Sequence, residues 1–99
     1  MIKKVTPKIT PEKVVVKANT IVKKFYNKDG ILTLSSEFDK KSGKIKKDVF
    51  MNPNGTKPIR ISKYDSNEHV ILDTFYKADG SPMGSVDYTD INHNLDLMI

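Results

Sequence analysis

The chain has 99 residues, a net charge of +5 at pH 7 and no Cys. This length allows one domain with a modest core, and the missing thiols exclude a disulfide framework and a thiolate metal site. No run approaches the roughly 18 apolar residues of a membrane-spanning helix, so we expect no membrane segment.

The first predicted element lies near residue 10. Thr10, Pro11 and Glu12 are typical of a helix start, with a capping hydroxyl, a Pro at the first helical position and an acid in the first turn. The β-branched run Val14–Val16 favours a strand. We predict a short helix or turn over residues 10–13 that leads into a strand.

Three similar segments follow, and each ends in an aromatic residue and a turn sequence. They read NTIVKKFYNKDGI, KIKKDVFMNPNGT and HVILDTFYKADGS, so that Phe25, Phe50 and Phe75 recur every 25 residues. Asp-Gly and Asn-Gly are favoured where the backbone takes a positive φ, and a preceding Asn can bond its own backbone. These segments predict strands that run into tight turns at residues 27–30, 52–55 and 77–80.

Between these segments lie return runs that end in a second set of turns, at residues 39–43, 65–69 and 89–93. The half-repeat of about 12 residues is typical of successive antiparallel strands, and Pro58 indicates a strand start or a bulge. Repeat units cover about 19–43, 44–68 and 69–93. Alternation puts Lys23, Asp48 and Asp73 on the face that carries the three Phe residues.

The fold that we predict is an all-β antiparallel meander of six or seven strands in a single domain over residues 1–99. The strands curl into a thin sandwich or half-barrel, and the apolar segment LDLMI at 95–99 forms a last strand or lies against the sheet. We expect a monomer.

Charge is distributed unevenly along the chain. Residues 1–50 hold thirteen Lys and five acidic residues, a net of +8, whereas residues 51–99 hold four basic and seven acidic residues, a net of −3. The halves would attract different partners. The predicted basic surface consists of Lys40, Lys41, Lys44, Lys46 and Lys47.

A second predicted surface is acidic and polar and lies in the two later turns. Its residues are Asp65, Asn67, Glu68, His69, Asp90, Asn92 and His93. The two His with a nearby carboxylate form a weak zinc candidate, but turn histidines are usually solvated and we expect no metal. A calcium loop is excluded because Phe25 and Phe50 stand where the first carboxylate ligand is required.

Catalytic and nucleic-acid motifs are weak. The sequence has neither a G-x-S-x-G nucleophile motif nor a phosphate loop, so we expect no enzyme activity and no cofactor. Nucleic-acid binding through Lys40–Lys47 stays an alternative, because a basic patch lies near Phe38 and Phe50. The acidic second half of the chain disfavours it.

The stretch FYNKDGILTLSSEFDKKSGKIKKDVFMNPNG at residues 25–55 resembles the short β repeats of predicted secreted proteins of phytoplasmas, whose units run roughly YYNPDGTI…EYDPKTGKLIKK. It is similar, more distantly, to the YD repeats of bacterial surface and toxin proteins. The resemblance covers about residues 20–90 and departs from the pattern at Tyr88-Thr89, where the YD pair is replaced.

This resemblance implies a secreted bacterial effector, with its signal peptide removed, that acts in the host cytoplasm or nucleus by binding host proteins. The chain is also similar in size, composition and lack of Cys to a phytoplasma effector that tethers plant zinc-finger transcription factors to a proteasomal ubiquitin receptor. The implied partners are therefore two host proteins on two surfaces. A surface-adhesion module is the alternative that the YD-like repeats imply.

Overall fold

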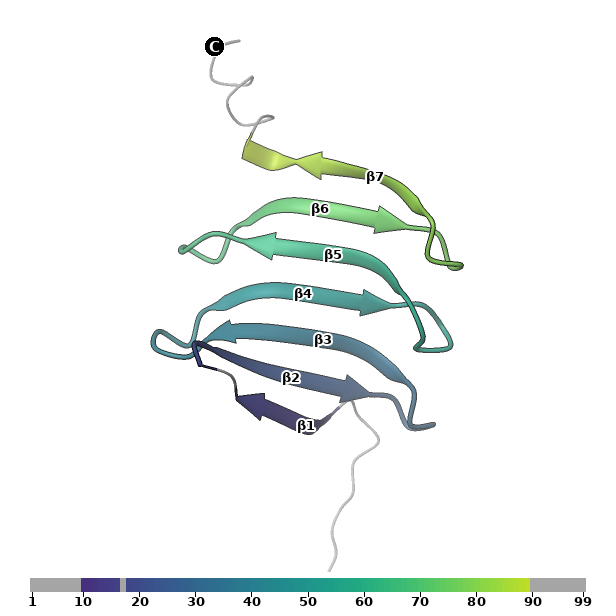
Figure 1. Ribbon diagram of the computed structural model, residues 1–99, viewed down its shortest axis with the longest axis horizontal. Coiled ribbons are helices and arrows are strands. Elements are labelled where there is room, and N and C mark those ends of the chain that lie inside the picture. The colour runs from purple at the N-terminus through teal and green to yellow at the C-terminus, as the bar shows by residue number, and fades with distance from the viewer. Residues whose placement is uncertain (1–9, 17, 90–99) are drawn as a thin grey trace, which may run out of the picture.

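The computed structural model describes residues 10–16 and 18–89. These residues fold into one open sheet of antiparallel strands, and Figure 1 shows the chain passing back and forth from one sheet edge to the other. The strands are β1 (Thr10–Val16), β2 (Thr20–Tyr26), β3 (Leu32–Asp39), β4 (Ile45–Met51), β5 (Pro58–Tyr64), β6 (Val70–Tyr76) and β7 (Pro82–Asp87).

The strand order in the sheet follows the chain order from β1 to β7, so each strand pairs with its sequence neighbours. This confirms the predicted all-β meander. The described strands form a single layer and not a two-layer sandwich, because every one of them belongs to the same sheet. Apolar contacts therefore form across neighbouring strands within a face.

The N-terminal helix that we predicted over residues 10–13 is wrong. These residues belong to β1, which pairs with β2 from Thr10 opposite Tyr26 to Val16 opposite Ile21. Strand pairing outweighs the capping signal because the β-branched residues that follow favour an extended backbone. The register shifts between Pro11 and Lys13, where Pro11 has no N–H to donate.

Both predicted sets of turns form within the described residues. Gly30, Gly55 and Gly80 have φ of 78°, 73° and 95°, which L-residues with a side chain rarely adopt. Figure 1 shows their three turns together at one end of the sheet, and the β3–β4 and β5–β6 turns at the other. The third turn at that second end, predicted at 89–93, and the predicted strand at 95–99 lie outside the described residues except for Thr89.

A register shift accompanies each hairpin. Shifts lie between Phe25 and Tyr26, Glu37 and Phe38, Phe50 and Met51, Lys63 and Tyr64, and Phe75 and Tyr76. Each bulge adds a residue to one strand and increases the local twist. The bulge predicted near Pro58 is confirmed, since Met51 pairs with Pro58 after Phe50 pairs with Arg60.

One face of the sheet carries two cross-strand rows, and this matches the predicted grouping of Phe with Lys23, Asp48 and Asp73. Paired residues in adjacent antiparallel strands share a face. The aromatic row is Phe25, Leu34, Phe50, Arg60, Phe75 and Gly84, and the polar row is Lys23, Ser36, Asp48, Ser62, Asp73 and Val86.

The best-buried side chains of the described residues lie mainly in the polar row, although we expected the opposite face to be the core. Ser36, Ser62 and Asp73 are 4%, 0% and 2% exposed, whereas the three Phe residues are only half-buried. The guanidinium of Arg60 lies 5.0 Å from the Phe50 ring centre and 6.0 Å from that of Phe75. It covers both rings and so replaces part of a second layer.

The polar row is held by a repeated hydrogen-bond unit. Ser36 Oγ and Tyr64 Oη donate to Asp48 at 2.5 and 2.8 Å. Ser62 Oγ and Tyr88 Oη donate in the same way to Asp73. In the first repeat both partners change together, since Lys23 replaces the Asp and its ammonium lies 5.2 Å from the ring centre of Phe38.

Candidate functional site

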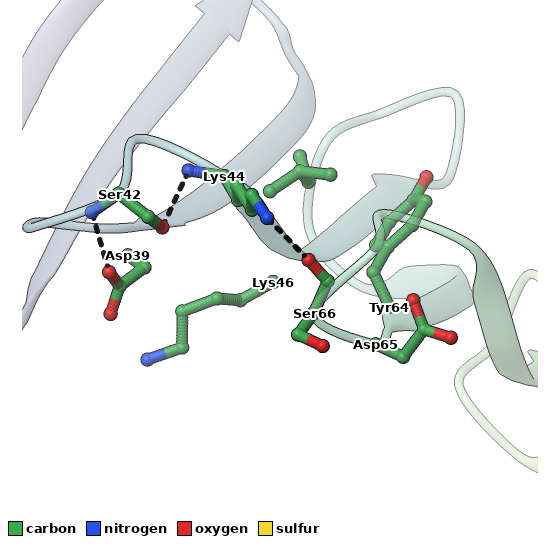
Figure 2. A pocket seen from close by; sticks show the side chains of 8 residues that line it. Asp39, Ser42, Lys44, Lys46, Tyr64, Asp65 and Ser66 are labelled. Carbon is green, nitrogen blue, oxygen red and sulfur yellow. Dashed lines mark hydrogen bonds between the residues drawn. The ribbon is translucent and has the colours of Figure 1, made fainter.

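An open pocket of about 330 Å³ lies at the sheet end opposite the three glycine turns. It is bordered by the basic turn, residues 39–44 between β3 and β4, and by the acidic turn, residues 65–69 between β5 and β6. Figure 2 shows side chains from both segments around it. The lining residues are Asp39, Ser42, Lys44, Ile45, Lys46, Tyr64, Asp65 and Ser66.

Each turn is built around an aspartate that accepts backbone hydrogen bonds. Asp39 Oδ2 accepts from Ser42 N at 2.8 Å, and Asp65 Oδ1 accepts from Asn67 N at 2.8 Å and from His69 N at 3.0 Å. The bond from Ser42 N lowers the pKa of Asp39, and the bond from His69 N lowers the pKa of Asp65. Both carboxylates are therefore ionised at neutral pH.

The two turns are joined by contacts across the pocket. Lys44 Nζ donates to the backbone oxygen of Ser66 at 2.9 Å, as Figure 2 shows. Ile45 N lies 3.4 Å from Glu68 Oε2, a long hydrogen bond. The neighbouring strands and these contacts together fix the separation of the turns.

Glu68 has an unusual backbone conformation for its residue type. Its φ is 64°, and it is the only non-Gly residue with a positive φ among those that the structure describes. Gly43, 25 residues earlier in the basic turn, has a φ of 75°. The acidic turn thus holds a side chain where the repeat places a glycine, and that side chain is the one that contacts Ile45.

The predicted basic surface is only partly gathered in one place. Lys40, Lys41, Lys44 and Lys46 are exposed in or beside the basic turn, and Lys46 Nζ donates to Thr20 Oγ1 at 3.1 Å. Lys47 points to the opposite face, because it pairs with Glu37 in the register, and its ammonium lies 3.3 Å from Glu37 Oε2. The side chains of Lys40 and Lys41 have no hydrogen bond or ion pair with another described residue.

The predicted acidic surface is present in part. Asn67, Glu68 and His69 are exposed, and Asp65 is half-buried at the pocket wall. The remaining members, Asp90, Asn92 and His93, lie outside the described residues. The structure brings the basic and acidic turns side by side, so the two predicted surfaces adjoin at the pocket. Among the residues described, no group of three or more His, Asp or Glu is placed to hold a metal ion.

Tyr64 and Ile45 form apolar parts of the pocket, and the sequence did not identify either as a site residue. Tyr64 drew attention only as an aromatic residue before a turn. Burial and then the hydrogen bond to Asp48 raise the pKa of Tyr64 to about 12, so its hydroxyl stays protonated. That hydroxyl is used by the fold, which leaves the ring as the binding surface.

The chemistry of the pocket is that of a binding site for charged and apolar groups. Ammonium groups and carboxylates surround an apolar wall made by Ile45 and Tyr64. In the described part of the chain, the Asp48 and Asp73 carboxylates accept hydrogen bonds from the fold itself. The structure describes no helix long and apolar enough to span a membrane.

Comparison with known proteins identifies a family. Residues 26–76 match the model of a protein family of unknown function, DUF2963. Searches of curated proteins and of solved structures returned no significant match. The matched segment includes both turns of the pocket and slightly more than half of the chain, and the chain therefore belongs to the DUF2963 family.

Proposed function

We propose that this domain is a non-enzymatic protein-binding module that uses the basic turn and the acidic turn as its contact surface. The observation that carries this proposal is the position of exposed charges of both signs around one open pocket. These charges stand on short turns between paired strands, and loops on a rigid scaffold are the usual place for binding residues.

The module acts, in the finer form of this proposal, as a secreted bacterial adaptor in the host cell. It bridges a zinc-finger transcription factor, through the acidic turn, to a proteasomal ubiquitin receptor, through the basic turn. The resemblance to phytoplasma repeats supports this role, and charge complementarity would steer both encounters. Because the turns adjoin, the two partners would be held next to each other, which suits a protein that delivers one to the other.

Protein is favoured over nucleic acid as the ligand. The carboxylates of Asp39 and Asp65 line the same pocket as Lys44 and Lys46, and Glu68 is exposed beside them. Carboxylates among the lysines repel phosphates, whereas a protein surface offers both signs of charge. A flat binding curve with generic DNA and RNA at low salt is the expected result.

The experiment is a capture of host proteins from plant extract with matched charge variants. One variant carries Lys40→Glu and Lys41→Glu, a second carries Glu68→Lys, and a control carries Lys28→Glu and Asp29→Lys in an exposed glycine turn at the far end. We expect wild type and control to recover a transcription factor together with proteasome subunits. The basic-turn variant should lose the proteasome subunits and the Glu68→Lys variant the transcription factor.

Two outcomes would overturn the proposal. Equal recovery by all four proteins would show that the turns do not bind, and recovery of glycans or cell-wall material in place of proteins would indicate adhesion. If both turn variants lost the same single protein, the module would bind one partner and would not bridge two.

A further inference from the structure

The charge of the pocket differs from one side to the other. Figure 2 shows Asp39 and Lys46 on one side, Tyr64 and Asp65 on the other, and Lys44 with Ser66 between them. On the Asp39 side, Lys46 acts on the carboxylate electrostatically and helps to lower its pKa. The exposed ammonium groups of Lys40 and Lys41 add positive charge to this turn.

The Asp65 side is acidic. Asp65 has only His69 as a cationic neighbour that lowers its pKa, and His is largely neutral at pH 7. Asp65 Oδ1 takes the two backbone hydrogen bonds of the turn, whereas Oδ2 accepts none from the described residues. Glu68 adds a second exposed carboxylate beside it.

The wall between these two sides is apolar and fixed in position. The Tyr64 hydroxyl is bonded to Asp48, and Ile45 begins β4 with its N–H directed to Glu68. Lys44 is tied to the backbone of Ser66. A ligand that enters the pocket thus meets a preformed surface, which lowers the entropy cost of binding.

We propose that the pocket binds an extended peptide segment of the partner in which an apolar residue separates a basic residue from an acidic one. The apolar side chain lies against Ile45 and Tyr64. The basic side chain reaches Asp65 Oδ2 and Glu68, and the acidic side chain reaches Lys40, Lys41 and Lys46. This inference rests on the proposed protein-binding function and names the chemistry of the segment that is bound.

The test uses end-capped five-residue peptides and the whole domain. The mixed peptide is Glu-Glu-Leu-Lys-Lys, and its controls are an all-acidic peptide, an all-basic peptide and a mixed peptide with Ser in place of Leu. We expect the mixed peptide to shift the backbone NMR signals of Ile45 and Ser66. Each control should bind about tenfold more weakly, since each loses one or two rim contacts or the apolar contact.

A charge-exchange series makes the test specific. Lys40→Glu with Lys41→Glu turns both sides acidic, and this variant should prefer the all-basic peptide to the mixed one. Adding Glu68→Lys to that variant restores opposite charges at the two sides, and the mixed peptide should regain affinity by binding in the reverse chain direction. Lys28→Glu with Asp29→Lys at the far end should change nothing.

The inference is overturned if the mixed peptide binds no better than the controls, if it does not bind, or if the shifted signals lie away from the pocket. The proposed function fails separately. Loss of host-protein capture in the turn variants, together with equal binding of all four peptides, would retain the binding surface and reject this description of its ligand.

Discussion

Asp73 shows how single polar residues stabilise a sheet of one layer. It is 2% exposed and accepts hydrogen bonds from Ser62 Oγ and Tyr88 Oη. The guanidinium of Arg60, which also covers two Phe rings, lies 3.4 Å from its carboxylate. A charged group at the centre of such a network is stabilising only while its partners remain.

We predict that Asp73→Ala lowers the free energy of unfolding by about 3 kcal/mol, because it leaves buried donors without an acceptor. Urea unfolding followed by circular dichroism measures the change. Asp29→Ala, at an exposed position in a glycine turn, should stay within about 0.5 kcal/mol of wild type. Equal effects of the two substitutions would contradict the network.

Asp73 also makes stability depend on pH. Burial acts to raise the pKa of Asp73, but the hydrogen bonds from Ser62 and Tyr88 and the charge of Arg60 outweigh it, so the pKa is lowered overall. The stabilisation is therefore fully present above the unfolded value of about 3.9 and is lost as pH falls through the folded value. Unfolding curves below pH 4 should show a smaller acid-induced loss for Asp73→Asn than for wild type; an identical loss would contradict this.

Glu68 carries a backbone cost that a glycine would not. At a φ of 64°, replacement by Gly should raise the free energy of unfolding by about 1 kcal/mol relative to Glu68→Ala. Both variants lose the contact with Ile45 N, so their difference in chemical denaturation isolates the backbone effect. If Glu68→Gly is no more stable than Glu68→Ala, the strained conformation is not present in solution.

The turns and strands act as elements that stack along the sheet edge. A Cβ on Gly55 would lie 2.8 Å from Ile31 Cγ2 and 3.0 Å from the backbone oxygen of Leu32, whereas a Cβ on Gly30 would have no atom within 4 Å. Asn52 Nδ2 donates to Ala78 O at 2.9 Å and so joins the second glycine turn to the third.

We predict that Gly55→Ala destabilises the domain more than Gly30→Ala. Both substitutions pay for a positive φ, about 1 kcal/mol, but only the first adds a clash with the backbone of the preceding hairpin. Thermal unfolding of the two variants gives the comparison, and equal melting temperatures would show that the turns do not stack.

The periodic residues made the elements predictable. Gly30, Gly55 and Gly80 mark the turns through their φ, and alternation placed Asp48 and Asp73 on the Phe face. The β1 strand was missed at its start because a local capping signal competes with pairing to β2, which is not visible in the sequence. Which face buries more also depends on tertiary contacts, such as Arg60 between two rings.

The candidate site was predictable only in its charged turns. Exposed Lys and acidic residues in turns 25 residues apart can be located from the repeat, and their adjacency follows from the meander. The pocket wall could not be anticipated, because Tyr64 belongs to it only through the hydrogen bond that fixes its ring near Asp48. The contact of Glu68 with Ile45 depends on a backbone conformation that the repeat assigns to glycine.

At the scale of the whole molecule, two ends of an open sheet have different roles in this account. The glycine turns stack and support the structure, and the basic and acidic turns around the pocket bind partners. The family match covers both sets of turns in the central part of the chain, so the division of roles can be tested directly on this domain.

Amide hydrogen exchange of the domain, free and bound to a host protein that it captures, tests the central claim most directly. Binding through the pocket predicts slower exchange on complex formation in residues 39–46 and 64–69, with unchanged exchange in the glycine turns at 27–30, 52–55 and 77–80. Slower exchange in the glycine turns or along the Phe face, with no change around the pocket, would contradict the account.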